Sequence, residues 1–258
     1  MLNITSKDNK TIKNIVKLIS KSKYRKEQGL FVVEGLRLCT DAIRSGALID
    51  TFICTEDAQT KYPEAVNELG NYALNSYTVP SNIFSTLSDT KTPQGVICVV
   101  KALDNEPQFD KINNKYVLLQ NMQDPSNLGA VLRSADALGF SGVILTKDCC
   151  DIYSPKVCRA SMGAIFRVPF IVCDDECAFV KDFNKSGKSY AAVVRGGTSI
   201  TEFKYDETSL ICIGNEGNGL TDDLVKVCTY PVTIPMKGNA ESLNAAAAAG
   251  IIMWEMIR

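Results

Sequence analysis

The 258-residue chain contains no histidine, and none of its ten cysteines forms a Cys-x-x-Cys pair. Without histidine there is no Ser-His-Asp or Cys-His nucleophilic site, no histidine metal ligand and no histidine general base. Most cysteines lie inside apolar stretches, such as Phe52-Ile53-Cys54 and Ile211-Cys212-Ile213. We therefore interpret them as small buried side chains rather than as disulfides, and we expect no metal site.

Long apolar runs and a strong net charge are also missing. The longest apolar stretch near the C-terminus, 245–254, spans ten residues, whereas a membrane-spanning helix needs about 20. The first 14 residues have no apolar core and no small-residue cleavage site, so no secretory signal is predicted. We expect a cytoplasmic protein that does not enter a membrane. The formal net charge of −1 gives no overall signature of nucleic-acid binding.

Charge is nevertheless unevenly distributed along the chain. Residues 7–26 contain eight lysine or arginine residues and one acid, Asp8. A local patch of this kind can bind phosphates even when the whole chain is nearly neutral. It is equally typical of the solvated face of a helix, and the sequence leaves both interpretations open.

Residue patterns divide the chain into two α/β regions. The polar, proline-containing segment 104–114 separates residues 1–103 from residues 115–258, and we interpret it as a linker. The first region begins with the basic helix and continues as a small alternating α/β unit. In the second region, strands at 116–120, 142–146, 168–173, 190–194, 210–213 and 232–234 alternate with helices at 127–138, from 155, at 176–184, 222–228 and 241–256. This alternation predicts a mostly parallel sheet.

Three segments of the second region have the residue types of a functional site. The first, 121–135, follows a predicted strand and opens a helix, at the strand end where ligands of open α/β sheets bind. Its candidate side chains are Asn127 and Arg133. They are six positions apart, which gives them only loosely similar directions on a helix. A well-capped turn with a surface arginine is the alternative interpretation.

The second segment, 211–220, takes a buried strand into a loop with three glycines and one acid, Glu216. Glycines such as Gly214 let a backbone approach a ligand closely. The loop matches neither a Walker sequence nor a dinucleotide fingerprint. A bare connection between a strand and a helix is the alternative.

The third segment, 234–244, places Ser242 and Asn244 in an otherwise apolar region that continues into five alanines. A buried polar group without a partner costs about 1–3 kcal/mol. We therefore expect both side chains to form hydrogen bonds with either the backbone or a ligand. The alternative interpretation is a helix whose first turn is capped by its own side chains.

Taken together, the three segments resemble the three motifs of the SpoU/TrmH family of RNA 2′-O-ribose methyltransferases, in the SPOUT superfamily. Their order agrees, and so do the internal spacings: Asn127 to Arg133, Gly214-x-Glu216, and Ile234-Pro235-Met236 followed by Ser242-Leu243-Asn244. One departure is the run 245–248, which is all alanine where the family usually has valine and serine. A softer similarity covers 20–100, where Lys23-Tyr24-Arg25 and the run 31–35 resemble the ribosomal-protein-like substrate-binding domain that often precedes this catalytic domain.

The resemblance implies a fold, a cofactor and an assembly. The fold would be an α/β sheet whose C-terminal segment is threaded into a trefoil knot, behind a small N-terminal α/β domain. The cofactor would be S-adenosylmethionine, bound through Gly214, Asn215, Ile234, Met236 and Leu243. The enzyme would be a homodimer, with catalytic groups contributed across the interface.

The same resemblance implies roles for polar side chains. Arg133 would stabilise negative charge on the ribose 2′-oxygen; we prefer this role to that of a base, because guanidinium groups keep their proton in proteins. Asn127 would hold ribose or phosphate, and Glu216 would orient Arg133 or its own loop. Ser242 and Asn244 would shape the reaction centre.

RNA contacts are expected from Lys23, Arg25, Lys26 and Arg159, although Arg159 is equally typical of a structural ion pair. We expect structured RNA as the substrate, with ribosomal RNA ahead of transfer RNA by analogy only. A non-catalytic RNA-binding or ribosome-assembly factor with the same fold is one alternative function. A related enzyme that methylates a base instead of a ribose is another.

Overall fold

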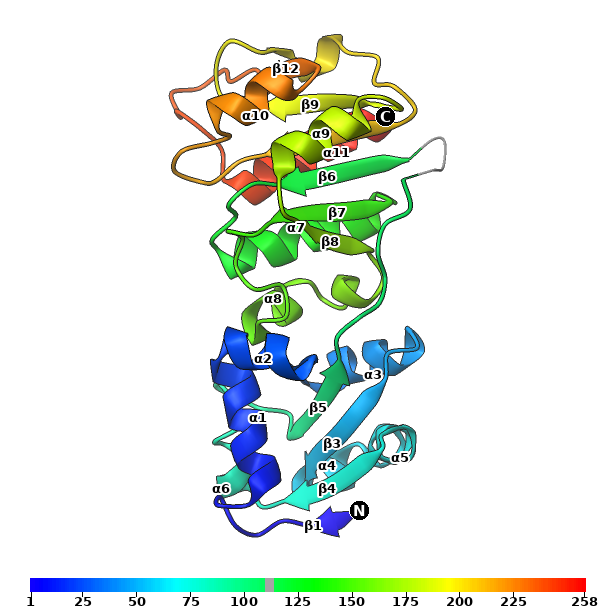
Figure 1. Cartoon of the computed structure of the whole chain (residues 1–258). Helices are drawn as coiled ribbons and strands as arrows, with labels where there is room; N and C mark the ends of the chain where they lie inside the picture. The colour runs from blue at the N-terminus through cyan, green and yellow to red at the C-terminus, as the bar shows by residue number, and fades with distance from the viewer. Residues whose placement is uncertain (110–113) are drawn as a thin grey trace. The chain divides into compact units, whose positions relative to one another are not determined.

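The computed structural model describes residues 1–109 and 114–258 (Figure 1). Its contacts divide it into two compact units, residues 1–104 with 153–166, and residues 105–152 with 167–258. This division differs from the predicted boundaries, because 153–166 groups with the first unit. Residues 105–109 of the predicted linker belong to the second unit, where the Phe109 ring lies 5.0 Å from the Tyr116 ring. Residues 110–113 of that linker lie outside the described residues.

The first unit is built on a five-stranded mixed sheet. Its strands, in spatial order, are β1 (Leu2–Asn3), β4 (Asn75–Val79), β3 (Ile49–Thr55), β5 (Val96–Lys101) and β2 (Leu30–Glu34). Strand β5 pairs antiparallel with both β2 and β3, and the other pairs are parallel. The helices are α1 (Lys10–Ser20), α2 (Ser22–Gln28), α3 (Leu36–Arg44), α4 (Glu56–Lys61), α5 (Pro63–Tyr72), α6 (Ser81–Phe84) and α8 (Pro155–Ala160).

Segment 153–166 completes this unit from far along the chain. The Tyr153 ring stacks on the fully buried Phe31 ring at 4.4 Å, and the Tyr153 hydroxyl accepts a hydrogen bond from the backbone nitrogen of Leu103 at 2.8 Å. As predicted, Ser154 caps α8 by accepting from the backbone of Val157, and Pro155 is its first residue. Aromatic stacking thus ties the segment to strand β2, and the cap fixes the start of its helix.

The second unit contains a seven-stranded sheet in which all pairs are parallel, as the sequence predicts. Its strands, in spatial order, are β10 (Thr198–Ser199), β12 (Tyr230–Thr233), β9 (Lys188–Ala192), β11 (Ser209–Ile213), β6 (Lys115–Leu119), β7 (Gly142–Thr146) and β8 (Phe170–Cys173). Its α-helices are α7 (Pro125–Ala137), α9 (Glu176–Phe183), α10 (Asp222–Val227) and α11 (Ala245–Ile257). Figure 1 shows α9 and α10 on one side of this sheet and α7 and α11 on the other.

Both faces of the central strands are covered, and this explains their sequences. Strand β11 is buried along its whole length, as is β6 after its first residue, and both are continuous apolar runs. Parallel strands packed between two helical layers have this composition. Because β6 and β11 are neighbours and parallel, the loops that follow them, which hold the first two sequence motifs, leave the sheet at the same edge.

Two helices of the second unit start at residues other than those predicted. Helix α7 begins at Pro125, because the Asp124 carboxylate accepts from the backbone of Ser126 at 2.7 Å. Helix α11 begins at Ala245 rather than at 241, because the Asn244 side chain accepts from the backbones of Ala246 and Ala247. Residues 241–244 are therefore irregular backbone in front of the helix.

All ten cysteines are free, and six of them are buried. In the described ranges no helix has the length and apolar character needed to cross a membrane. The same ranges hold no group of three or more cysteine, aspartate or glutamate side chains arranged for a metal ion.

Candidate active site

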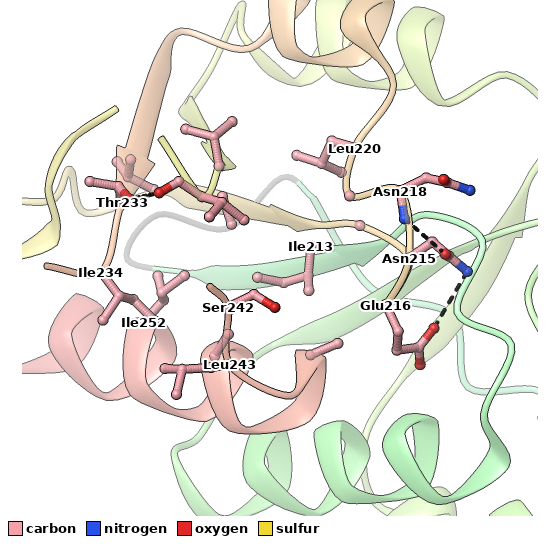
Figure 2. Close-up of a pocket in the computed structure, with 18 of the residues that line it drawn as sticks. Ile213, Asn215, Glu216, Asn218, Leu220, Thr233, Ile234, Ser242, Leu243 and Ile252 are labelled. Carbon is pink, nitrogen blue, oxygen red and sulfur yellow. Dashed lines mark hydrogen bonds between the residues drawn. The ribbon is translucent and has the colours of Figure 1, made fainter. Parts of the chain in front are cut away.

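A cavity of about 400 Å³ lies at the carboxyl ends of β9, β11 and β12. Its walls come from the loop after β11, from the segment after β12 and from the irregular backbone before α11 (Figure 2). All five residues predicted to contact the cofactor line it: Gly214, Asn215, Ile234, Met236 and Leu243. The second and third sequence motifs, with thirteen residues between them, therefore converge on one cavity.

The loop after β11 is closed so tightly that its first residue must be glycine. A Cβ atom on Gly214 would lie 2.0 Å from the carbonyl carbon of Gly219 and 2.2 Å from the nitrogen of Leu220. Asn215 and Gly219 exchange two backbone hydrogen bonds, of 3.1 and 2.9 Å. The loop is thus a compact turn, and any side chain at position 214 would force it open.

The side chain of Asn215 holds this turn in place. Its Oδ1 accepts from the backbone nitrogens of Gly217 at 2.8 Å and Asn218 at 3.3 Å, and its Nδ2 donates to the carbonyl of Asn121 at 2.9 Å. Asn121, in the left-handed region at φ 54°, ends the turn after β6. Asn215 therefore connects the second motif to the first as well as lining the cavity.

Asn127 joins all three motifs. Its Nδ2 donates to Glu216 Oε1 at 2.7 Å, and its Oδ1 accepts from Asn244 Nδ2 at 3.0 Å. Because Asn244 Oδ1 already accepts from the first amides of α11, its Nδ2 must face Asn127, and the Asn127 amide must then face Glu216. The result is a hydrogen-bond chain in one direction, from α11 through Asn244 and Asn127 to the carboxylate.

Glu216 and Ser242 both line the cavity, and Glu216 also receives a 3.4 Å hydrogen bond from Asn215 Nδ2. Figure 2 shows Ser242 between the end of β11 and helix α11, with Glu216 on one side of it and Thr233 and Ile234 on the other. The structure therefore brings together four of the five predicted catalytic residues: Asn127, Glu216, Ser242 and Asn244.

Arg133 is the exception. It is exposed on α7, does not line the cavity and has no hydrogen bond or ion pair with any residue of the described ranges. The expectation of loosely similar directions is wrong: Asn127 is 8% exposed and faces the protein, whereas Arg133 faces solvent. Six helical positions rotate a side chain by about 240°, so the two occupy different sides of α7.

Sequence reasoning missed a second polar connection beneath the cavity loop. Gln120 Oε1 accepts from the backbone of Thr221 at 2.9 Å, and Gln120 Nε2 donates to Thr221 Oγ1 at 3.0 Å and to Glu176 Oε1 at 2.7 Å. Gln120 is 5% exposed. A glutamine directly after a buried strand is the signal that could have found it, since a buried amide needs partners.

Two cysteines beside the first motif are structural. The Cys149 thiol donates to the carbonyl of Leu119 at 3.1 Å and accepts from the backbone nitrogen of Met122. Burial raises the pKa of Cys149, and burial followed by nearby negative charge raises the pKa of Cys150 to about 12. Both thiols stay protonated at neutral pH, so neither supplies a thiolate nucleophile.

The predicted RNA contacts divide into two pairs. Lys23 and Lys26 are exposed on α2. Arg25 is 6% exposed and donates to the carbonyls of Leu18 at 2.6 Å and Ile19 at 3.1 Å, so it closes the end of α1 instead of reaching solvent. Arg159 pairs with Asp89 at 2.6 Å and approaches Glu34 at 3.8 Å. Arg159 was predicted either to contact RNA or to form a structural ion pair, and these distances are those of the ion pair.

Comparison with known families matches residues 114–254 to the SpoU rRNA methylase family and residues 9–98 to the MRM3-like substrate binding domain. The chain belongs to the SpoU rRNA methylase family, which confirms the resemblance carried by the three motifs.

The chain is also similar to individual members along its whole length. It is 29% identical, over 99% of each chain, to the 23S rRNA (guanosine(2553)-2′-O)-methyltransferase RlmP of Bacillus subtilis. Its fold is similar to the AdoMet-bound rRNA methyltransferase of Sinorhizobium meliloti, with a TM-score of 0.87 and 29% identity over 98% of this chain and 96% of that one. For the SpoU methyltransferase AviRb of Streptomyces viridochromogenes, in complex with AdoMet, the TM-score is 0.86 at 28% identity, over 96% and 97%.

Proposed function

We propose that this protein transfers the methyl group of S-adenosylmethionine to a ribose 2′-hydroxyl of structured RNA, with ribosomal RNA as the substrate. The observation that carries the proposal is the convergence of all five predicted cofactor residues on one cavity, beside the hydrogen-bond chain of Asn244, Asn127 and Glu216. Two similar structures contain AdoMet, and the similar RlmP is named for 2′-O-methylation of a guanosine in 23S rRNA.

The cavity has the properties that this cofactor needs. Its volume lies within the roughly 300–1,000 Å³ of small-molecule sites. Ile213, Leu220 and Ile252 give apolar walls for a flat heteroaromatic ring, and the glycine turn that begins at Gly214 brings backbone close to it. The Glu216 carboxylate adds negative charge to the cavity lining, and negative charge favours binding of a positive sulfonium group.

When bound, S-adenosylmethionine supplies a methyl group that is already activated by its positive sulfur. The 2′-hydroxyl would lose its proton to water or to the neighbouring phosphate. The oxyanion so formed would bond to the methyl carbon as the carbon–sulfur bond breaks, and S-adenosylhomocysteine would leave with that electron pair. The chain must therefore align the ribose, which contributes up to about 7–11 kcal/mol, and stabilise the developing oxyanion. We assign the second task to the guanidinium of Arg133.

The polar chain of the site has a positioning role. The Asn127 amide donates to Glu216 and accepts from Asn244. We therefore assign it the role of fixing these two side chains, in addition to any contact with the ribose. Ser242, on the irregular backbone before α11, lines the cavity with its hydroxyl available to substrate. Gly214, Asn215, Ile234, Met236 and Leu243 hold the cofactor.

The position of Arg133 supports a homodimer in which each copy completes the other's site. Arg133 lies outside the cavity of its own chain, and the exposed side of α11 is strongly apolar, with Ile251 42%, Trp254 57% and Ile257 42% exposed. A contiguous apolar face of this kind is typical of an interface. We place α11 at a two-fold contact that brings Arg133 of one copy to the cavity of the other. The trefoil-knotted path of the C-terminal segment is part of the same proposal, as is a cytoplasmic location.

The test uses the purified protein, labelled S-adenosylmethionine and unmodified 23S rRNA transcript, with total tRNA in parallel. Digestion of the product to nucleosides is expected to give a 2′-O-methyl nucleoside from the rRNA. A methylated base would overturn the ribose assignment, and labelled tRNA alone would overturn the substrate. Calorimetry with S-adenosylmethionine separates an enzyme from a non-catalytic factor, for which no heat of binding is expected.

A further inference from the structure

Charge in the first unit is segregated along the chain. Residues 1–29 contain eight lysine or arginine residues and two acids, whereas residues 30–104 contain five and nine. The structure gathers much of the positive charge on α1, which has three lysines and no acid over Lys10–Ser20. Positive charge therefore lies on α1, α2 and the residues beside them, whereas residues 30–104 of the same unit are acidic.

Helix α1 has two chemically opposite sides. Ile12, Ile15 and Leu18 are buried against the sheet in a core shared with α6. Lys10 and Lys17 are exposed, and their spacing of seven positions returns them to one side of the helix, about 10 Å apart along its axis. Lys21 is also exposed and is the extended residue that directly follows the helix. Such a row suits a series of anions and exceeds the size of one small anion.

Contacts between α1 and α2 hold this row in place. Arg25 of α2 donates to two of the last carbonyls of α1. The hydroxyl of Tyr24 donates to Asn14, and Lys17 Nζ lies 5.6 Å from the centre of the Tyr24 ring. The helix carrying the lysines is therefore anchored, and their charged ends reach solvent.

One neighbouring lysine is already neutralised. Lys13 Nζ lies 2.7 Å from Asp8, and the bond and charge of Lys13 lower the pKa of that carboxyl, so Asp8 stays ionised at neutral pH. For Lys10, Lys17 and Lys21, no carboxylate within ion-pair distance is found among residues 1–109 and 114–258. We call these three side chains the basic ridge.

We infer that the basic ridge binds the phosphate backbone of the substrate RNA. The inference rests on the proposed function, which supplies RNA as the partner. A membrane surface is disfavoured as the partner because the apolar side of α1 is buried in the core. Val16 is the one large apolar side chain that this helix exposes. Base stacking on Tyr24 is disfavoured because its ring is half-buried against the core, with Lys17 Nζ over it. The ridge therefore supplies affinity and leaves the choice of target to the catalytic unit.

The first test replaces the ridge by neutral side chains, Lys10→Gln/Lys17→Gln/Lys21→Gln. The matched control, Lys61→Gln/Lys181→Gln/Lys204→Gln, removes three exposed lysines elsewhere. Binding of unmodified 23S rRNA transcript is measured against salt concentration. Each lost phosphate contact lowers the slope of log affinity against log salt by about 0.7–0.9, so we expect a loss of about 2–3 for the ridge variant and little change for the control.

Kinetics separate the ridge from the proposed function. We expect the ridge variant to raise KM for RNA about tenfold at physiological salt, with kcat at saturating RNA and the affinity for S-adenosylmethionine unchanged. If the wild-type protein methylates RNA and the ridge variant keeps the wild-type KM and salt slope, the ridge does not bind RNA. The proposed function is then unaffected. A wild-type protein that methylates no RNA would overturn the proposed function.

A second variant works in the opposite direction. Asp8→Asn frees Lys13 and is expected to tighten RNA binding and to steepen the salt slope by up to about 0.9. Weaker or unchanged binding contradicts a phosphate-binding α1. Vesicles of phosphatidylcholine and phosphatidylglycerol are the remaining control: ridge-dependent binding to them, with no ridge effect on RNA, would replace RNA by a membrane surface as the partner.

Discussion

The cavity of the second unit and the basic ridge of the first hold their polar side chains in different ways. Around the cavity, Asn127, Asn215 and Gln120 each use both ends of an amide on other parts of the same unit. On the ridge, Lys10, Lys17 and Lys21 extend from a firmly packed helix into solvent. Methyl transfer needs the reacting groups in a fixed orientation, and hydrogen-bond chains hold the side chains that orient them. Backbone recognition needs charge at a suitable spacing, which flexible side chains supply.

The largest expected effect concerns Arg133, the one catalytic candidate that is not held by its own chain. Arg133→Ala should lower kcat by about 10²–10³ with S-adenosylmethionine affinity unchanged, because it removes a charge needed only in the transition state. Arg133→Lys should recover part of this loss, because the lysine ammonium keeps the positive charge but lacks the planar set of hydrogen-bond donors of a guanidinium. Single-turnover methylation and calorimetry measure the two quantities.

Mixed assemblies give the control for this prediction. Arg133→Ala and Glu216→Gln chains are each expected to be weakly active, and a mixture of them should recover activity because one site of each mixed dimer is complete. If activity does not recover in a mixture that is shown to exchange subunits, Arg133 acts in the site of its own chain and the proposed cross-subunit role is wrong.

The next effect concerns the glycine turn. In Gly214→Ala the new methyl group would overlap the backbone of residues 219 and 220, so the loop must open. We expect at least about a tenfold loss of S-adenosylmethionine affinity, equivalent to about 1.4 kcal/mol. Gly238→Ala is the matched control: nothing lies within 4 Å of its added Cβ, and its affinity should stay near wild type.

The direction of the hydrogen-bond chain makes a sharper prediction. Asn127→Asp places a carboxylate against Glu216, and the lost donor should cost about 1–3 kcal/mol in urea unfolding. Adding Glu216→Gln restores a donor, because the new aspartate can accept from both the new glutamine and Asn244. The double variant should therefore be more stable than Asn127→Asp alone. If the two effects simply add, the chain is not oriented as described.

The smallest effect belongs to Gln120, which supports the loop from below. Gln120→Ala removes the bonds to Thr221 and Glu176, so KM for S-adenosylmethionine should rise by roughly fivefold, which corresponds to about 1 kcal/mol for the lost hydrogen bonds. Maximal kcat should stay within a few-fold, because Gln120 does not line the cavity. A fall in kcat at unchanged KM would place it in the chemistry instead.

The residues of the site could be predicted because their types and spacings recur as three motifs, and parallel strands bring the following loops to one edge. The start of α11 could not, because Asn244 can belong to a helix or cap one, and only its partners decide. The burial of Arg25 was missed for a related reason. A run of basic residues predicts exposure on average, but the open carbonyls at the end of α1 require a donor, and Arg25 supplies it.

Segment 153–166 has a consequence for the modularity of this protein. The family match to the methylase spans it, yet its Tyr153 covers Phe31 and its Arg159 pairs with Asp89, both of which belong to the first unit. A fragment cut at residue 104 would expose a large aromatic side chain and leave Asp89 and Glu34 without their arginine. The first unit is thus encoded in two pieces. A chimera built by one crossover between relatives should fold poorly unless both pieces come from the same parent.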